Sequence, residues 1–190
     1  MRTWKKALDA AIAANAHRPE SRYVQLATVD DEGRPAVRTV VFRKFFGYAG
    51  SLMFCADGRS EKIGELTTHP DVEACWYFPE TRQQFRLAGT MILVGPSDPR
   101  PEHAEARDQL WASLSSESRS TFAWPPPGQD CAPLEAFQVP VPSATDPLET
   151  FHLLILEPRQ VESLDLRARP HRRLISRRSG SGWQDFPINP

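Results

Sequence analysis

The feature that most constrains the fold of this chain is a series of short segments separated by turn residues. These segments show the two-residue alternation of β-strands. Residues 23–29 are followed by the turn Asp30-Asp31-Glu32-Gly33, and residues 84–94 alternate apolar and other side chains. The chain lacks the long helices between strands that a doubly wound nucleotide-binding sheet requires. The sequence therefore predicts a mainly β protein, a small antiparallel barrel with flanking helices.

The expected elements fit one domain over residues 1–190. An N-terminal helical region occupies residues 1–17, with an amphipathic helix at 3–16, and Ser60 is expected to cap a helix at 61–68. A helical stretch at 101–122 precedes a Pro-rich loop at 124–148, which is expected to wrap other parts of the molecule. Residues 23–56 are predicted to form a meander. Strands are predicted at 23–29, 36–45, 51–56, 72–78, 84–94 and 151–156, and residues 169–190 hold a hairpin of 172–176 with 183–188.

Charge and cysteine content narrow the set of partners. The formal net charge is −1, so the chain is not expected to bind nucleic acid through bulk electrostatics. Cys55, Cys75 and Cys131 lack the spacing of zinc ligands or of a disulfide framework, so no metal site is expected. No segment resembles a signal peptide or a membrane span. These features favour a cytoplasmic protein that binds neither nucleic acid nor membrane.

A row of cations stands out near the C-terminus. At the period of a β-strand, Arg169, His171 and Arg173 point to one face, with Arg172 and Leu174 on the other. Like charges at neighbouring same-face positions repel one another, so a negative group is expected among them. The alternative is a solvated face of an edge strand.

Other polar groups favour a phosphate site over hydrolase chemistry. The chain has no dinucleotide fingerprint, phosphate loop, nucleophile elbow or His-Glu-x-x-His motif. Ser60-x-Lys62 combines a hydroxyl, an ammonium and a helix start, which together hold a phosphate well. Arg38 and Arg43 lie on opposite faces of a regular strand, so they serve one ligand only across a bulge or a strand edge. Scattered surface charge is the alternative for each residue alone.

The order of several motifs resembles the FMN-binding split barrel of the pyridoxamine 5′-phosphate oxidase family. The first set of motifs is Arg38-Thr-Val-Val-Phe-Arg43, Asp57-Gly-Arg-Ser-Glu-Lys62, Cys75-Trp-Tyr-Phe78 and Arg82-Gln-Gln-Phe-Arg86. A second set resembles one branch of that family: Trp111-x-x-Leu-Ser115, Arg119-x-x-Phe-x-Trp-Pro125, Pro127-Gly128 and Asn189-Pro190. The resemblance implies an antiparallel, Greek-key type split β-barrel, a homodimer and FMN as cofactor.

The resemblance also implies roles for individual residues. Ser60 and Lys62 would hold the flavin phosphate, Gln84 would reach the flavin of the partner subunit, and Arg169 with His171 would contact the substrate. The FMN-binding set that it implies is Arg38, Thr39, Val40, Val41, Arg43, Ser60, Lys62, Gln84 and Arg173. The sequence departs from the oxidase pattern where Arg43 replaces Lys, Glu61 replaces Arg, and Cys55-Ala56 replace Tyr-Thr. Arg119 and Trp124 are candidates to replace the residues that hold the substrate phosphate.

The function implied by the resemblance is oxidation of pyridoxamine or pyridoxine 5′-phosphate to pyridoxal 5′-phosphate. The flavin accepts a hydride and dioxygen reoxidises it, so no catalytic side chain is required. Three alternatives remain open: an FMN-dependent reductase or oxidase of another small substrate, a flavin-binding module without turnover, or a structural barrel with a solvated cation row.

Overall fold

The computed structural model describes residues 3–47 and 50–190, so residues 1–2 of the expected N-terminal region and residues 48–49 lie outside the described residues. In the described part, nine strands form one sheet: β1 (Tyr23–Val29), β2 (Pro35–Val41), β3 (Lys44–Phe46), β4 (Ser51–Asp57), β5 (Asp71–Phe78), β6 (Gln83–Val94), β7 (Phe151–Asp165), β8 (Arg172–Ser179) and β9 (Gly182–Ile188). The helices are α1 (Thr3–Ala14), α2 (Glu61–Thr68), α3 (Pro101–Ala112) and α4 (Ser116–Ser120), with short 3₁₀ turns at Pro19–Arg22, Thr121–Ala123 and Leu134–Phe137.

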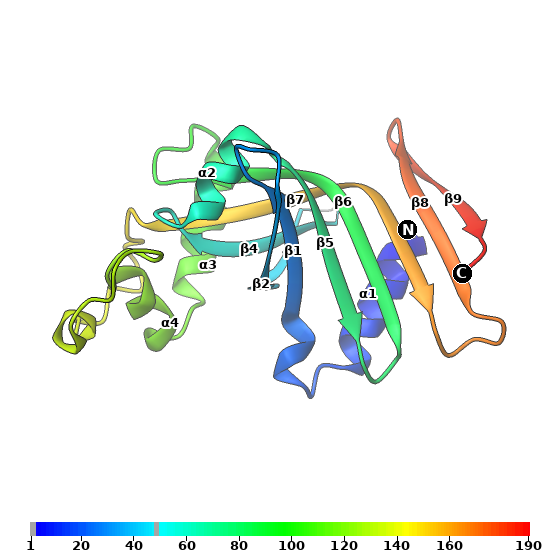
Figure 1. Ribbon diagram of the computed structural model, residues 1–190, viewed down its shortest axis with the longest axis horizontal. Helices are drawn as coiled ribbons and strands as arrows, with labels where there is room; N and C mark the ends of the chain where they lie inside the picture. The colour runs from blue at the N-terminus through cyan, green and yellow to red at the C-terminus, as the bar shows by residue number, and fades with distance from the viewer. Residues whose placement is uncertain (1–2, 48–49) are drawn as a thin grey trace.

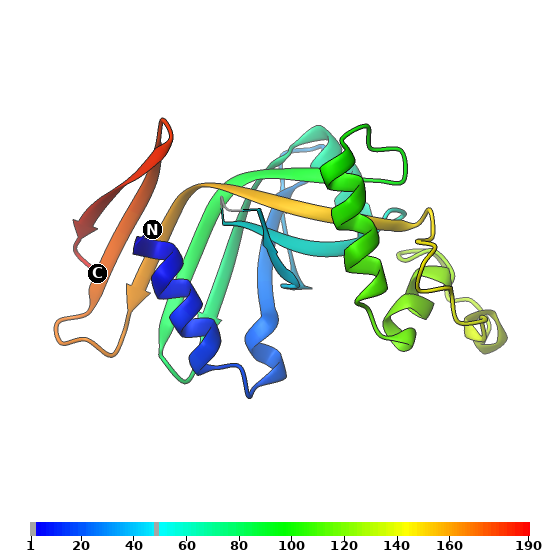
Figure 2. The ribbon, with the colours of Figure 1, turned by 180° about the vertical axis from the view of Figure 1, so that it is seen from behind.

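The sheet is antiparallel throughout and curls into an open half-barrel (Figures 1 and 2). Its strand order is β2-β1-β5-β6-β7-β4-β3, with β8 added to β7 and β9 to β8. The predicted antiparallel β architecture is confirmed. The predicted meander over residues 23–56 is wrong, because β2 and β3 lie at opposite ends of this order.

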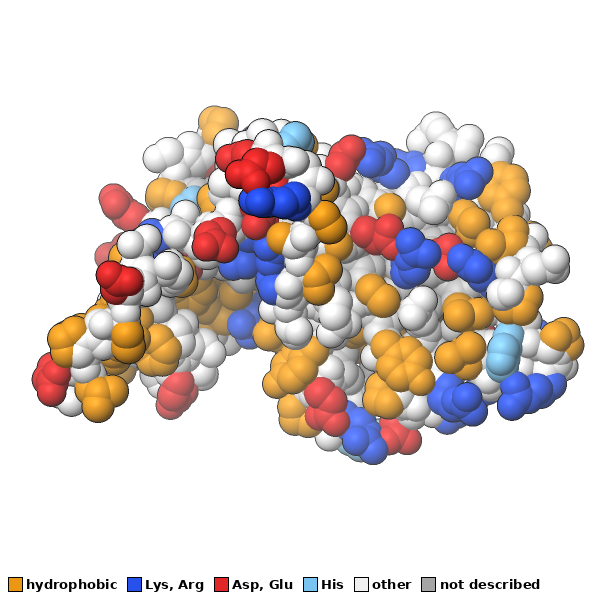
Figure 3. Space-filling view, viewed as in Figure 1, with side chains coloured by type: hydrophobic (Ala, Val, Ile, Leu, Met, Phe, Trp, Pro, Cys, Tyr) orange, Lys and Arg blue, Asp and Glu red, His pale blue; other side chains and the backbone are white. Residues whose placement is uncertain are grey.

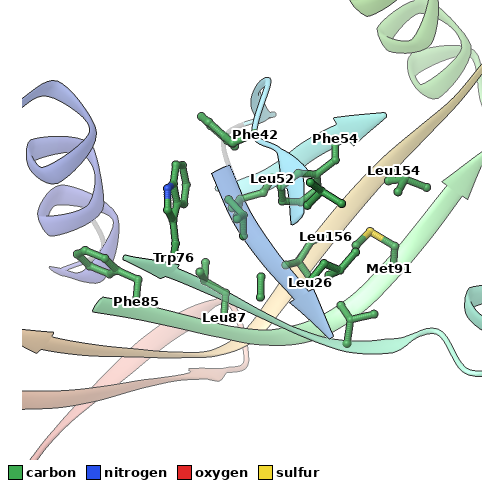
Figure 4. Close-up of a cluster of buried hydrophobic side chains, with 14 of the residues drawn as sticks. Leu26, Phe42, Leu52, Phe54, Trp76, Phe85, Leu87, Met91, Leu154 and Leu156 are labelled. Carbon is green, nitrogen blue, oxygen red and sulfur yellow. The ribbon is translucent and has the colours of Figure 1, made fainter. Parts of the chain in front are cut away.

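The inner face of the sheet carries the main core (Figure 4). Trp76 and Phe54 are fully buried there, and the indole Nε1 of Trp76 donates to the carbonyl of Ser21 at 2.8 Å. Helix α1 covers this face, as Figure 2 shows, through Trp4 and Leu8. The amphipathic spacing at the N-terminus therefore predicts the correct helix and its role as a cover. A second core cluster lies under α3.

The strand predicted at 36–45 is broken at Phe42 and Arg43. The backbone N–H of Phe42 donates to Arg22 at 2.8 Å, whereas that of Arg43 donates to Met53 at 2.9 Å. The chain thus leaves the β1 side and joins the β4 side between two consecutive residues. The buried ring of Phe42 packs against Trp76, with ring centroids 4.8 Å apart, and fixes this crossing in the core.

Strand β7 is much longer than the predicted segment at 151–156. It continues past Pro158, where the pairing with β6 shifts register between Ala88 and Gly89. A Cβ on Gly89 would lie 2.1 Å from the carbonyl oxygen of Glu157, so glycine allows the close approach at this bulge. The extension brings β7 alongside β8.

The helical stretch predicted at 101–122 is interrupted after Ala112. Ser115 accepts the N–H of Ser118 at 3.2 Å and caps α4, which starts a new direction. The Pro-rich segment, residues 124–148, has no strand and follows α3 and α4 away from the sheet (Figure 1). It does not wrap the sheet; the Nε1 of Trp111 instead donates to the Ser143 carbonyl at 2.7 Å.

His152 is packed between two glycines at the end of β4, and this packing yields a test. An ideal Cβ on Gly58 would lie 2.4 Å from the imidazole, and one on Gly95 would lie 3.0 Å from its Nε2, so the ring lies close to the backbone of both glycines. We expect Gly58→Ala to lower the free energy of unfolding by about 1–3 kcal/mol, as overpacking does. Gly64→Ala, in open space on α2, should raise it by roughly 0.5–1 kcal/mol. Urea denaturation measures both, and a Gly58→Ala protein as stable as the unaltered chain would contradict the packing.

Candidate functional site

The turn between β4 and α2 brings Ser60 and Lys62 together. The Lys62 ammonium donates to the Ser60 Oγ at 2.9 Å. Ser60 has the extended backbone of an N-cap residue, but its hydroxyl donates to the carbonyl of Asp57 at 2.7 Å. The expected side-chain cap is therefore wrong, because the hydroxyl is committed to the turn. The helix itself has the predicted bounds, 61–68.

Arg38 reaches from β2 to helix α2, which follows this turn. Its guanidinium donates to both carboxylate oxygens of Glu65, at 3.1 and 2.8 Å, and to the hydroxyl of Thr28. Burial lowers the pKa of Lys62, and the nearby charge of Arg38 lowers it further. Two cations therefore lie close together in a partly buried place. A bound anion would offset both the desolvation and the repulsion.

The other predicted residues of β2, Thr39, Val40 and Val41, point to opposite faces of the sheet. Val40 is buried in the core, so its side chain is not available to a ligand. Thr39 is exposed and Val41 half-buried, and they pair with Gln25 and Tyr23 of β1. Thr39 and Val41 therefore lie on the outer face of the sheet, opposite to the side of Val40.

Arg43 lies in a pocket of about 510 Å³ between the end of β4 and the Pro-rich segment. Its Nε is buried and has no hydrogen-bond partner among the described residues. A buried N–H without an acceptor is costly, so this atom is placed to donate to a bound group. Asp57 lines the pocket and its carbonyl accepts the Ser60 hydroxyl, so the pocket adjoins the turn. The side chains that give the pocket its character are Cys55, Phe122, Trp124, Asp130 and Phe137.

Gln84 and Arg173 lie on the outer face at the other end of the sheet. Leu164 of β7 pairs with Gln84 on one side and with Arg173 on the other, so the three side chains form one row. The guanidinium of Arg173 donates to Glu162 at 2.9 and 2.8 Å. Glu162 supplies the negative group that the sequence predicted beside this cation.

The prediction that Arg169, His171 and Arg173 form a row on one face of a strand is wrong. Strand β8 begins at Arg172, so Arg169 and His171 precede it in a loop. The Nη1 of Arg169 lies 3.4 Å from the Nε2 of His171, and the His171 Nδ1 lies 3.1 Å from the carbonyl oxygen of Ala168. The two residues are close neighbours, as predicted, but the loop and not strand periodicity brings them together.

Within one chain, the residues around Ser60 and Lys62 lie far from those around Gln84 and Arg173. Phe151 at one end of β7 pairs with Asp57, and Leu164 near its other end pairs with Arg173. At a rise of about 3.3 Å per residue these positions are about 40 Å apart along the strand. Figures 1 and 2 show the same separation, with α2 and β4 at one end of the sheet and β8 at the other.

Several contributors to the site were not predicted from the sequence, among them Phe122, Asp130 and Phe137 of the pocket wall. Arg59 binds Asp57 and two carbonyls of the segment near Trp124, and Glu65 and Glu162 balance the cations. A signal existed only for Arg59, because an Asp side chain commonly accepts the backbone N–H of the residue two positions later in a turn. Arg119 was a candidate for substrate phosphate, but its guanidinium donates to the carbonyls of Leu114 and Pro142 and does not line the pocket. Trp124 does line it.

In the part of the chain that the structure describes, no three His, Cys, Asp or Glu side chains gather in a way that could bind a metal ion. No described helix has both the length and the apolar character to cross a bilayer.

Comparison with known proteins identifies the family. The sequence model of the family described as pyridoxamine 5′-phosphate oxidase, FMN-binding domain, matches residues 1–95. Pyridoxine/pyridoxamine 5′-phosphate oxidase 2 of Arabidopsis thaliana is 37% identical over 98% of this chain and 96% of its own length.

Two solved structures share the fold. A pyridoxamine 5′-phosphate oxidase-related FMN-binding protein of Nostoc punctiforme is 39% identical, with a TM-score of 0.96 over 100% of this chain and 99% of that one. PhzG of Burkholderia lata, in complex with tetrahydrophenazine-1-carboxylic acid, has a TM-score of 0.80 at 24% identity over 99% of this chain and 91% of its own. The chain has the FMN-binding split-barrel fold and belongs to the pyridoxamine 5′-phosphate oxidase family of FMN-binding proteins.

Proposed function

We propose that this chain is an FMN-dependent oxidoreductase whose flavin site is shared by two copies of the chain. The observation that carries the proposal is the buried Nε of Arg43, which has no hydrogen-bond partner among the described residues and lies in a pocket that adjoins the Ser60 and Lys62 turn through Asp57. FMN, the cofactor of this family, has a phosphate at one end and a ring with acceptor atoms at the other. The phosphate end suits the two cations Lys62 and Arg38, and the acceptor atoms of the ring suit the buried Nε of Arg43.

The phosphate end is held by charge and by hydrogen bonds. Lys62 and Arg38 would donate to the phosphate, and the Ser60 hydroxyl would donate to it by exchanging its hydrogen bond to the Asp57 carbonyl for one to the phosphate. Glu65 keeps the Arg38 guanidinium fixed by two hydrogen bonds, so the arginine is oriented before the ligand arrives.

The ring end lies beside Arg43 and the aromatic residues of the pocket. The Nε of Arg43 would donate to an acceptor on the edge of the ring, and Trp124 and Phe137 would exclude water from one side. Burial raises the pKa of the Cys55 thiol, which keeps this part of the wall uncharged. When bound, FMN supplies two-electron redox chemistry with dioxygen as the final acceptor.

A second copy would supply Gln84 and Arg173. The outer face of the sheet carries a neutral ladder of Glu73, Arg86, Glu162 and Arg173 over β5 to β8, and Figure 3 shows acidic and basic side chains alternating there. Exposed apolar side chains flank it: Tyr23, Tyr77, Phe186 and Ile188. A closed two-fold pair over this face would bury apolar surface without an uncompensated charge and would form two equal sites.

Pyridoxamine and pyridoxine 5′-phosphate are the first substrates to test, because the Arabidopsis relative is named as their oxidase. Arg169 and His171 would contact the substrate phosphate from the second copy. A different small substrate is the second candidate. It is favoured by one observation: Arg43 is the only Lys or Arg among the described residues that line the pocket, and Arg119 is committed to backbone carbonyls.

The phosphate end can be tested with the cofactor alone. Lys62→Ala and Arg38→Ala should each weaken FMN binding by ~1.5–3 kcal/mol, the worth of a hydrogen bond to a charged group. Affinity should also fall with rising pH through the pKa of Lys62, which lies below that of an ordinary lysine, because only the ammonium attracts the phosphate. Quenching of FMN fluorescence measures both effects. Lys6→Ala, an exposed site on α1, is the control, and unchanged affinity in Lys62→Ala and Arg38→Ala would count against this placement.

The substrate can be tested by anaerobic reduction. Pyridoxamine 5′-phosphate should bleach the flavin absorbance of the pure protein. Arg169→Ala and His171→Ala should keep FMN and raise the KM by roughly 10- to 150-fold, as loss of one charged contact does. Arg167→Ala, in the same loop, should leave the KM unchanged. Flavin that is bound but stays oxidised with every phosphorylated vitamer supports the second candidate, and protein that takes up no FMN refutes the proposal.

A further inference from the structure

Arg59 connects three separate segments at the candidate phosphate turn. Its backbone N–H and Nε donate to Asp57 Oδ1 at 2.8 and 2.9 Å, and its Nη2 donates to Asp57 Oδ2 at 2.6 Å. The same Nη2 reaches the carbonyl oxygen of Trp124 at 2.9 Å and that of Phe122 at 3.3 Å. One guanidinium therefore bridges the end of β4 and the start of the Pro-rich segment.

The far end of the Pro-rich segment returns to the same turn. The Thr150 hydroxyl donates to the carbonyl of Phe122 at 2.7 Å, and the N–H of Gly58 donates to the carbonyl of Thr150 at 2.7 Å. Both ends of the segment are thus tied to residues 57–60. Between its ends the segment is largely exposed and pairs with no strand of the sheet. Trp111 and Arg119 hold its later part at the carbonyls of Ser143 and Pro142, so the ties at the turn matter most for the part before Pro142.

The segment that Arg59 holds forms the aromatic wall of the pocket. The rings of Trp124 and Phe137 pack edge to face with centroids 5.6 Å apart, and both line the pocket that contains Arg43. Arg59 is itself paired with the Asp57 carboxylate, which neutralises its charge locally. Its hydrogen bonds therefore point to a role in placing the wall, in contrast to the phosphate-facing role of Lys62.

We propose that Arg59 is a positioning residue that fixes the aromatic wall of the flavin pocket to the turn that binds the cofactor phosphate. The inference rests on the proposed function for the identity of the ligand. Because one side chain holds both parts, order in the turn and order in the wall are coupled. FMN at the turn then restrains the wall, and by reciprocity an ordered wall favours FMN.

The chain offers a matched control. Arg100 makes the same local arrangement with Asp98: its N–H and Nε donate to Oδ1, both at 2.9 Å, and its Nη2 donates to Oδ2 at 2.5 Å. Among the described residues, no hydrogen bond of Arg100 reaches the Pro-rich segment. Arg100→Ala thus removes an equivalent Asp-x-Arg turn without touching the wall.

Hydrogen exchange of the backbone amides of Ala136 and Gln138, which are hydrogen-bonded within residues 128–138, tests the proposal in the full chain. Exchange of this segment should be about tenfold faster in Arg59→Ala than in the unaltered protein, the effect of losing charge-assisted hydrogen bonds from a local opening equilibrium. Arg59→Lys should behave like Arg59→Ala, since an ammonium cannot fork onto a carboxylate and two carbonyls together. Arg100→Ala should exchange like the unaltered protein. Saturating FMN should slow exchange of the segment in the unaltered chain but not in either Arg59 variant.

The outcomes separate this inference from the proposed function. If the unaltered chain does not bind FMN, the proposed function fails, while the comparison of Arg59 and Arg100 variants without FMN still decides whether Arg59 holds the wall. If FMN binds but Arg59→Ala exchanges like the unaltered protein, the positioning role is refuted. If Arg100→Ala loosens the segment equally, the effect is general destabilisation and the inference is again refuted.

Discussion

The double pairing of β7 determines how the candidate site is assembled. The first part of this strand pairs with β4, which leads to the phosphate turn. Its last part lies between Gln84 of β6 and Arg173 of β8. A single continuous strand thus holds the two groups of polar residues at opposite ends of the sheet. A cofactor much shorter than that strand contacts both groups only if a second chain brings its own β8 end to the first chain's β4 end.

The crossing at Phe42 and Arg43 completes this arrangement. If residues 36–45 formed one regular strand, Arg38 and Arg43 would point to opposite faces. The change of backbone partner from Arg22 to Met53 instead sends Arg38 toward α2 and Arg43 into the pocket beside β4. The buried ring of Phe42 stabilises the change, so the core of the barrel and the geometry of the site depend on the same residue.

The sequence pattern predicted those elements of the fold that depend on residues close together in the chain. Strand β1 and helix α2 have the predicted bounds, and β5 and β6 form the expected hairpin. The strand break at Phe42 and the extension of β7 past Pro158 could not be predicted, because both depend on backbone partners far away in the sequence. Strand periodicity also failed for Arg169 and His171, since β8 starts only at Arg172.

The site was predictable in its residue types more than in its geometry. Ser60 and Lys62 are two positions apart, so one turn necessarily brings them near each other, and Arg38 joins them through contacts with α2. The carboxylates of Glu65 and Glu162 gave no signal, because each meets its arginine only through sheet or helix packing. The resemblance to a known family supplied the grouping that spacing alone left open.

The central claim, a flavin site built from two chains, is tested most directly by mixing two defective proteins. Lys62→Ala damages one end of the site and Arg173→Ala the other, so each alone should bind FMN weakly. When the two are unfolded and refolded together, random two-fold pairing should restore normal affinity at about a quarter of all sites, because each mixed dimer has one intact site. Recovery of that fraction, measured by FMN titration, is the predicted result. A mixture with no high-affinity sites, or an Arg173→Ala protein that binds FMN normally by itself, would contradict the account.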